Sequence, residues 1–215
     1  PINTAFQMIK ILLPSSFNDL YFGGRMLRKV ILSCLLMNSV FALAAGQDIY
    51  KLSFKNIEGK NQEMKDYRGK TLLIVNTASQ CGYTKQYSGL EKLYQAHKNK
   101  GLVVIGFPSN SFKQELDNDA EVAKFCKMRF GVKFPLASIT PVKGPNRHPI
   151  YSYLINNTQQ DSGQDVSWNF EKFVVGPDGK VKGRFSSRIE PDDKKLLAAI
   201  TSKTTPKPPI KSKMN

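Results

Sequence analysis

A chain of 215 residues with 40% hydrophobic residues is long enough for one domain with a buried core and short extensions. Its 32 lysines and arginines exceed its 17 acidic residues, which gives a formal net charge of +15. The basic residues form no arginine-rich block and do not alternate with aromatic residues, which argues against nucleic-acid binding. We interpret the charge as a solvated basic surface, with weak attraction to anionic membranes or acidic partners as the alternative.

Residues 26–44 have the three parts of a secretory signal peptide. Arg28 and Lys29 supply a short positive region, residues 30–41 supply an apolar core, and Ala42-Leu43-Ala44 supplies a small-residue cleavage site. The apolar run is too short to span a membrane. We therefore expect an exported protein, periplasmic or secreted, with no stable membrane insertion.

The rest of the chain divides into one domain and its flanks. Residues 45–202 are expected to form a single domain, and residues 203–215 are a basic, proline-rich tail that we expect to be disordered. Residues 1–25 are interpreted as an over-extended start or as sequence added by cloning. One cysteine falls inside the signal peptide, so the mature protein would keep Cys81 and Cys126. In an oxidising compartment such a pair forms either a structural disulfide or a redox couple.

The first half of the domain has the pattern of a strand, a hairpin and a βαβ unit. An apolar run at residues 71–75 predicts a strand buried on both faces, a helix follows to about Lys98, and residues 102–107 predict a second buried strand. Two strands joined by a helix should be parallel, with a right-handed crossover. Before this unit, residues 49–54 alternate as a strand, and residues 55–68 predict a hairpin.

The second half predicts three helices and a second hairpin. Acidic residues begin a helix at 119–128, and Pro149 suits the first turn of another at 149–154. A turn at 177–179 separates strands at 166–175 and 181–185, and a last helix covers 192–200. This order predicts an α/β fold of the thioredoxin-like sandwich type. In it a central mixed sheet is flanked by helices, with an added N-terminal β-hairpin.

Cys81 falls on the turn from a buried strand to a helix, and we expect it at or just before the first turn of that helix. The N–H groups at a helix start have no partners within the helix, and the macrodipole places partial positive charge beside them. Both effects favour the thiolate, which is the reactive form of cysteine. Cys81 is therefore the candidate nucleophile.

Three short motifs stand out along the domain. Asn76-Thr-Ala-Ser-Gln-Cys-Gly82 resembles the signature around the peroxidatic cysteine of the glutathione peroxidase family, and Gly106-Phe-Pro-Ser-Asn110 resembles that family's second signature. Trp168-Asn-Phe-Glu-Lys-Phe173 is similar to the third. The three occur in the family's order and spacing, and the likeness extends from about residue 49 to 200.

The resemblance implies a thiol peroxidase that reduces hydrogen peroxide and organic or lipid hydroperoxides in antioxidant defence. Cys81 stands at the peroxidatic position, where a thiolate is oxidised to a sulfenic acid. Gln114, Trp168 and Asn169 match the rest of the family's catalytic tetrad, although the loop before Gln114 is one residue shorter here. Their neutral N–H donors would stabilise the thiolate and the departing oxygen.

The resemblance also implies how the enzyme is reduced. Cys126 matches the resolving cysteine of thioredoxin-dependent members, and the alternative is a small buried apolar residue. A thioredoxin-like protein or glutathione would serve as the co-substrate. The short connection at 151–167 indicates a monomer. No metal or other cofactor is expected, and His97 and His148 are interpreted as surface or turn residues.

Two other functions stay open at this stage. A disulfide oxidoreductase would be expected to carry Cys-x-x-Cys, and Cys81-Gly-Tyr-Thr84 lacks the second cysteine. An exported thioredoxin-like binding module without peroxidase activity would use its two cysteines as a permanent disulfide.

Overall fold

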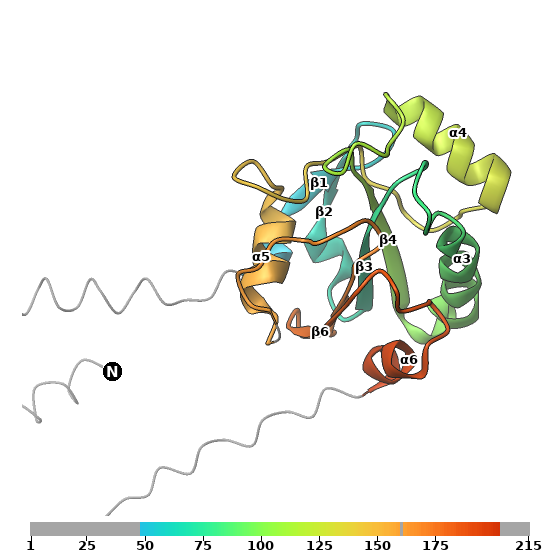
Figure 1. Cartoon of the computed structure of the whole chain (residues 1–215). Coiled ribbons are helices and arrows are strands. Elements are labelled where there is room, and N and C mark those ends of the chain that lie inside the picture. The colour runs from blue at the N-terminus through green and yellow to red at the C-terminus, as the bar shows by residue number, and fades with distance from the viewer. Residues whose placement is uncertain (1–47, 160, 203–215) are drawn as a thin grey trace, which may run out of the picture. The chain divides into compact units, whose positions relative to one another are not determined.

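A four-stranded mixed sheet forms the centre of the computed structural model, which describes residues 48–159 and 161–202 (Figure 1). The upstream residues 1–25, the expected signal peptide 26–44 and the tail 203–215 lie outside the described residues. The strands are β1 (Ser53–Lys55), β2 (Asn61–Glu63), β3 (Thr71–Thr77), β4 (Leu102–Pro108), β5 (Lys172–Val175) and β6 (Val181–Phe185). The α-helices are α3 (Gln86–His97), α4 (Asp119–Phe130), α5 (Pro149–Asn157) and α6 (Lys194–Thr201), and the 3-10 turns are η2 (Ile49–Lys51), η3 (Met64–Tyr67) and η4 (Lys98–Lys100).

The order of the strands in the sheet is β4-β3-β5-β6. β3 and β4 pair in parallel through the α3 connection, which confirms the βαβ unit. β5 pairs antiparallel with β3 and β6, so the second predicted hairpin is also confirmed. β1 and β2 form the separate N-terminal hairpin. The thioredoxin-like α/β fold expected from the order of the elements is therefore confirmed.

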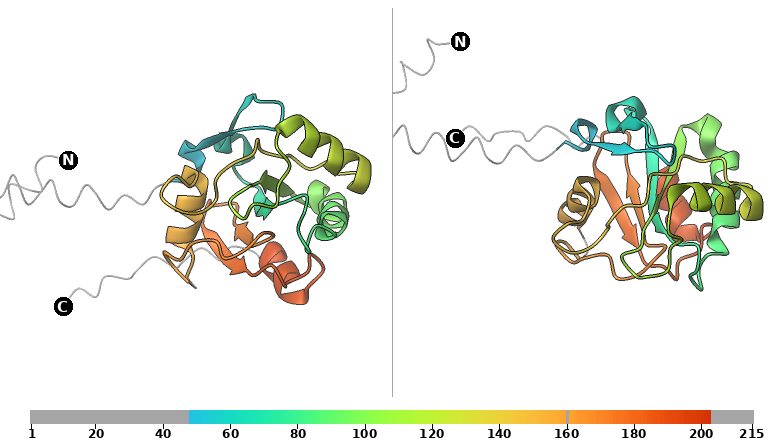
Figure 2. Two further views of the ribbon diagram at one scale, coloured as in Figure 1. Left: turned by 45° about the horizontal axis from the view of Figure 1, so that its top comes forward. Right: turned by 90° about the horizontal axis from the view of Figure 1, so that it is seen from above.

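Alternation along β3 divides the core between the two faces of the sheet. Leu72 and Ile74 pack in an apolar cluster with α5, and Leu73 and Val75 pack in a second cluster with α3 and α6. Figures 1 and 2 show α5 on one side of the sheet and α3 and α6 on the other. A strand that is buried on both faces has no polar face, and this explains the continuous apolar run in the sequence.

Two of the predicted strands are wrong in extent. Residues 49–54 begin as η2, because Asp48 caps the turn by accepting a hydrogen bond from the Tyr50 N–H at 3.0 Å. Residues 166–171 do not join the sheet. Phe170 there has a φ of 64°, which is outside the range of strands.

The helices agree with the sequence within a few residues. Asn118 caps α4 by accepting from the Glu121 N–H, and Gly131 ends the helix in the left-handed conformation. Pro149 stands in the first turn of α5, as predicted. The last helix begins two residues later than expected, because Asp193 is its N-cap and not part of its first turn.

The turn between β5 and β6 accepts hydrogen bonds from two elements that are distant in the sequence, η2 and α5. The Tyr50 hydroxyl donates to the carbonyl oxygen of Pro177 at 2.9 Å, and the Tyr153 hydroxyl donates to that of Gly179 at 2.8 Å. Gly179 has a φ of 81°, and a Cβ built on it would lie 2.8 Å from a ring carbon of Tyr50. The turn therefore needs glycine both for its backbone conformation and for its packing.

We expect Gly179→Ala to lower the free energy of unfolding by about 2–4 kcal/mol, from the cost of left-handed backbone and the clash with Tyr50. Gly59→Ala is the matched control, since Gly59 has a φ of 76° with nothing near its Cβ position. It should cost about 1–2 kcal/mol, the conformational part alone. Urea unfolding of both variants measures the difference, and equal losses would show that contact with Tyr50 does not matter.

Candidate active site

Cys81 lies in the turn that follows β3, and α3 begins only at Gln86. The helix thus starts five residues after the cysteine, which corrects the expectation that Cys81 lies in or next to its first turn. The Cys81 N–H donates to the Thr84 Oγ1 at 3.0 Å, and the Thr84 hydroxyl lies 2.9 Å from the Ala78 carbonyl oxygen. Because a threonine hydroxyl competes with backbone partners, Thr84 holds these residues in a turn and delays the helix.

A backbone donor from this turn reaches the sulfur. The Tyr83 N–H donates to the Cys81 Sγ at 3.5 Å, and the cysteine is 9% exposed. An N–H group directed at sulfur stabilises negative charge on it. The N–H group that reaches the sulfur therefore belongs to a turn and not to a helix end.

The loop that carries Gln114 rests on the Cys81 turn. The Gln80 N–H donates to the carbonyl oxygen of Gln114 at 2.9 Å, and the Ser79 N–H donates to the Glu115 Oε1 at 3.0 Å. Lys113 just before has a φ of 57°, so the loop turns sharply there. These bonds place Gln114 beside the cysteine turn even though the loop is one residue shorter than in the family pattern.

The Trp168-Asn169 segment, which leads into β5 next to β3, reaches the same place. The Asn169 Nδ2 group donates to the Gln114 Oε1 at 2.9 Å. The Asn76 Nδ2 group, at the end of β3, donates to the Trp168 carbonyl oxygen at 2.9 Å. The Phe170 N–H returns a bond to the carbonyl oxygen of Asn76 at 2.6 Å. The three segments that carry the predicted tetrad therefore meet at the carboxyl end of β3.

A groove of about 480 Å³ opens beside the indole, which is 41% exposed. Tyr83 and Trp168 line it, and Ser186, Ser187 and Arg188 form another part of its wall. The side chain of Gln86, at the start of α3, donates to the Ser187 carbonyl oxygen at 2.8 Å and fixes this wall. The groove gives a small molecule access to the residues next to Cys81.

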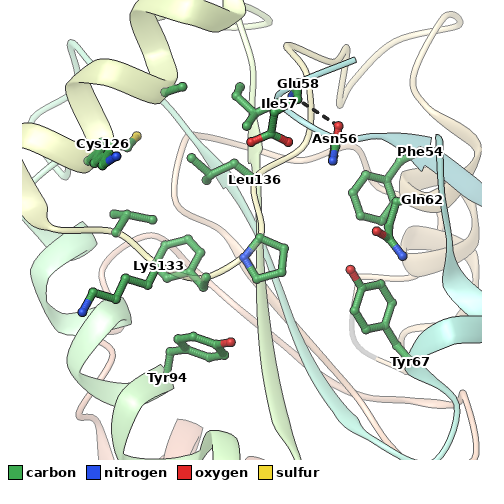
Figure 3. Close-up of a pocket in the computed structure, with 15 residues that line it drawn as sticks. Phe54, Asn56, Ile57, Glu58, Gln62, Tyr67, Tyr94, Cys126, Lys133 and Leu136 are labelled. Atoms are coloured by element: carbon green, nitrogen blue, oxygen red, sulfur yellow. Dashed lines mark hydrogen bonds between the residues drawn. The ribbon is translucent and has the colours of Figure 1, made fainter. Parts of the chain in front are cut away.

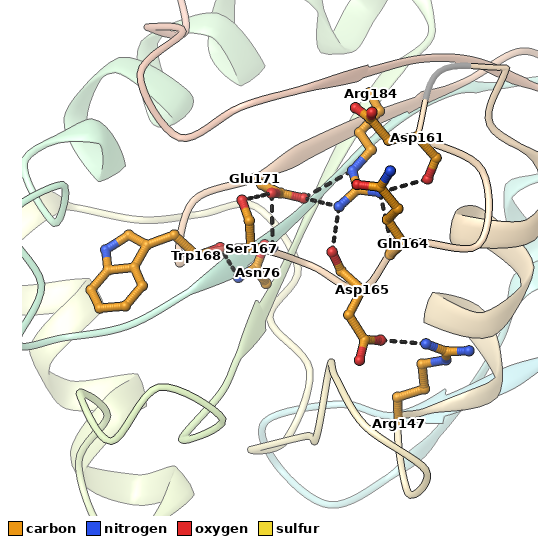
Figure 4. A network of polar contacts seen from close by, with 9 residues as sticks. All are labelled: Asn76, Arg147, Asp161, Gln164, Asp165, Ser167, Trp168, Glu171 and Arg184. Carbon is orange, nitrogen blue, oxygen red and sulfur yellow. Dashed lines mark hydrogen bonds and ion pairs between the residues drawn. The ribbon is translucent and has the colours of Figure 1, made fainter.

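A buried ion pair anchors the chain on either side of Trp168. Arg184 donates to the Glu171 Oε2 at 2.8 and 3.0 Å, and the two side chains are 7% and 4% exposed. The other carboxylate oxygen of Glu171 accepts from the Ser167 N–H at 2.9 Å and from its hydroxyl. Figure 4 shows Glu171 between Ser167 and Arg184, with the indole of Trp168 directed away from this network.

Cys126 lies on the inner face of α4 and is fully buried, in the same apolar cluster as Cys81. Both thiols are free. Burial raises the pKa of Cys126 to about 11, so its thiol is protonated at neutral pH. Cys126 also belongs to the wall of a pocket of about 440 Å³ beneath α4, which Tyr94 and Lys133 line as well (Figure 3).

Several residues of the site received no role from the sequence. Thr84, Glu115 and Asn76 each hold a backbone group of the site, and Glu171 and Lys172 are buried charges in or beside β5. The sequence signal that could have indicated these residues is the presence of polar side chains where a buried strand should be apolar, at the end of β3 and at the start of β5. His97 and His148 take no part in the site, and no cluster of metal-ligand residues occurs in residues 48–159 and 161–202.

Comparison with known proteins gives the site its context. A family model described as glutathione peroxidase matches residues 49–155. Glutathione peroxidase-like peroxiredoxin GPX5 of Chlamydomonas reinhardtii is 43% identical over 148 residues, covering 68% of this chain and 91% of that protein. The chain belongs to the glutathione peroxidase family. Hydroperoxy fatty acid reductase gpx1 of a Synechocystis strain is 42% identical over 156 residues, covering 69% of this chain and 92% of that protein.

Two solved structures have the same fold. The crystal structure of Trgpx in apo form matches with a TM-score of 0.58 at 35% identity, covering 74% of this chain and 98% of that one. The T. cruzi GPX1 structure matches with a TM-score of 0.57 at 32% identity, covering 72% and 97%.

As a glutathione peroxidase, the protein is an oxidoreductase that acts on peroxides, a thiol peroxidase that reduces hydroperoxides. Enzymes of the family use thiols as co-substrates rather than a prosthetic group. The relatives do not favour the binding module or the disulfide oxidoreductase that the sequence left open. Within the described part of the chain, no helix has the length and apolarity needed to cross a membrane.

We expect Arg184→Met to destabilise the protein by about 3–5 kcal/mol, because it leaves the Glu171 carboxylate buried without its counter-ion. Arg147→Met is the control, since the Arg147 side chain, paired with Asp165, is 24% exposed. It should cost at most about 1 kcal/mol. Urea unfolding measures both values, and a loss for Arg184→Met no larger than that of the control would contradict the role of this pair.

Proposed function

We propose that Cys81 is the peroxidatic residue of this thiol peroxidase and that Gln114, Trp168 and Asn169 complete its active site. The observation that carries the proposal is the hydrogen bond from Asn169 to Gln114, with Gln114 bonded in turn to the residue before Cys81. These bonds link the neutral side chains of Asn169 and Gln114 to the turn that carries Cys81. Neutral groups can stabilise a thiolate without neutralising it by proton transfer.

In the first step the Cys81 thiolate attacks one oxygen of the hydroperoxide. A sulfur–oxygen bond forms, the O–O bond breaks, and the leaving alkoxide or hydroxide takes a proton to become an alcohol or water. Sulfur loses two electrons and the peroxide gains them. Asn169 uses its Nδ2 group on the Gln114 Oε1, so Gln114 keeps its own amide N–H groups for the sulfur or the leaving oxygen.

In the second step Cys126 attacks the sulfenic acid. A disulfide with Cys81 forms and water leaves, after the Cys126 thiol has given up its proton. Bridging needs Cα atoms within about 7 Å, and we propose that part of α4 unwinds to bring the buried Cys126 to Cys81. Val122 and Cys126 are the buried residues of α4, so few apolar contacts oppose this opening. While the helix is folded, burial keeps the thiol protonated and unreactive.

A thioredoxin-like protein is the proposed reductant of this disulfide, with glutathione as the alternative that would attack the sulfenic acid directly. The groove beside Trp168 suits an alkyl chain as well as hydrogen peroxide, since part of its lining is aromatic. The relative named hydroperoxy fatty acid reductase supports lipid hydroperoxides among the substrates. Export, antioxidant defence and a monomeric state remain parts of the proposal that rest on the sequence.

Cys81→Ser should lower the rate of peroxide consumption by on the order of 10³-fold or more, because a hydroxyl at this position is not ionised. Peroxide loss with thioredoxin and thioredoxin reductase, or with glutathione, measures the effect with hydrogen peroxide and with a fatty-acid hydroperoxide. The fold should be preserved, as circular dichroism can verify. Undiminished turnover by the variant would contradict the assignment of Cys81 as the peroxidatic residue.

Cys126→Ser should still consume one equivalent of peroxide per Cys81 but stop turning over with thioredoxin, because no disulfide can form. Turnover with glutathione should persist if glutathione reduces the sulfenic acid directly. In the wild type, mass spectrometry after one equivalent of peroxide should find a Cys81–Cys126 disulfide. If the oxidised wild type lacks that disulfide and the variant turns over normally with thioredoxin, Cys126 is only a small buried residue of α4.

A further inference from the structure

Lys172 is a lysine at the start of the central strand β5 whose side chain is completely buried. Its Nζ donates to the carbonyl oxygen of Phe170 at 2.9 Å. Burial lowers the pKa of Lys172 to about 8, and the nearby carboxylates of Glu190 and Glu171 act in the opposite direction. Burying a lysine in an apolar strand costs free energy. A specific function of the ammonium group would explain why a lysine occupies this position.

The group that Lys172 holds is the backbone turn after Asn169. Phe170 has a φ of 64°, a conformation that a bulky side chain rarely adopts and that costs on the order of 1–3 kcal/mol. Its ring is fully buried and packs edge-on against the ring of Tyr87, with 5.4 Å between the ring centroids. Its N–H is held by the Asn76 carbonyl oxygen and its own carbonyl by Lys172. The two bonds on Phe170 thus fix a strained turn from both sides.

This turn sets the direction of the two preceding side chains. Trp168 is bonded through its carbonyl to Asn76, and Asn169 reaches Gln114. On the N-terminal side, Ser167 is bonded to the Glu171–Arg184 pair (Figure 4). If the Phe170 carbonyl were released, the turn could relax toward ordinary backbone, and the indole and amide would move with it.

We propose that Lys172 is a positioning residue of the peroxidase site. Its ammonium holds the left-handed turn at Phe170 and so presents Trp168 and Asn169 to the Cys81 region. This role rests on the proposed function of the tetrad. Lys172 itself touches neither the sulfur turn nor the Trp168 groove through any bond in the described residues.

The charge of Lys172 is part of this role. A hydrogen bond from an ammonium is roughly twice as strong as one from a neutral amine. Since burial brings the pKa of Lys172 to about 8, the side chain loses its charge as the pH rises from 7 to 9. The charged groups that act on it are Glu171 and Glu190, with Arg184 paired to Glu171. The turn should therefore loosen over the same interval.

The first test compares Lys172→Met with Lys182→Met in a Cys126→Ser background, which isolates the reaction of Cys81 with peroxide. Lys182 is the matched control, because its Nζ also donates to backbone carbonyls, those of Ala199 and Ser202 at the end of α6. We expect Lys172→Met to slow the loss of the Cys81 thiol to hydrogen peroxide by about tenfold or more. Lys182→Met should change the rate less than twofold.

Trp168 is the only tryptophan of the chain, so its fluorescence reports on the turn directly. Lys172→Met should change the emission and its quenching by acrylamide, and Lys182→Met should leave both unchanged. A variant that loses only thermal stability, with normal rate and emission, would overturn the positioning role. The fluorescence measurement does not depend on whether the Cys81 sulfur reacts with peroxide.

The second test needs no substitution at Lys172. In a Cys81→Ser background, which removes the ionisation of the sulfur, Trp168 fluorescence is titrated from pH 6 to 10. We expect a transition with a midpoint near pH 8, absent when Lys172→Met is added and kept when Lys182→Met is added. A flat titration, or a transition that survives Lys172→Met, would contradict the proposal even if Cys81 proves to be the peroxidatic residue.

Discussion

Buried polar groups at the end of β3 and just after it make hydrogen bonds to distant segments, and these bonds assemble the candidate site. The Asn76 side chain is fully buried and bonds to the Trp168 carbonyl, 92 residues later in the chain. The Ser79 N–H bonds to the carboxylate of Glu115, 36 residues later. A buried polar group without a partner costs about 1–3 kcal/mol, so these pairings are enforced by folding itself. Formation of the core therefore brings the three segments of the site together.

The two cysteines occupy contrasting environments on the same side of the sheet. Cys81 lies in a turn, where a backbone N–H reaches its sulfur and a groove opens nearby. Cys126 lies on the buried face of α4, where burial raises the pKa of its thiol to about 11. Cys81 is therefore the more accessible of the two thiols. The buried, protonated thiol of Cys126 is protected from direct oxidation, since oxidants attack the thiolate.

The segment from Ser167 to Lys172 carries two buried charged side chains, Glu171 and Lys172, in otherwise apolar surroundings. Glu171 is paired with Arg184, and Lys172 is bonded to the backbone of Phe170. Buried ion pairs contribute little net stability compared with apolar packing, but losing one partner is expensive. The pair and the lysine therefore specify one conformation of the segment more than they stabilise the domain. The conformation they specify is a strained turn beside the Trp168 groove, where the site needs precision.

Local patterns in the sequence were sufficient for the elements whose physics is local. The apolar run of β3, the glycine that ends α4 and the proline at the start of α5 each act within a few residues, so the predicted fold is confirmed. Local patterns failed where a distant bond overrides propensity, as at residues 166–171, which alternate like a strand but are held in a turn by the bond from Phe170 to Asn76.

Motifs and periodicity lie along the chain, so they were enough to indicate the family, the fold and the candidate site residues. How those residues meet follows from the tertiary structure. It showed that a turn N–H rather than a helix end reaches the Cys81 sulfur, that Asn169 bonds to Gln114, and that a buried lysine holds the turn beside them. The bond from Asn169 to Gln114 joins residues 55 positions apart, so no window of the sequence contains both partners. The two shorter-range bonds depend on backbone turns whose conformation the local pattern did not indicate.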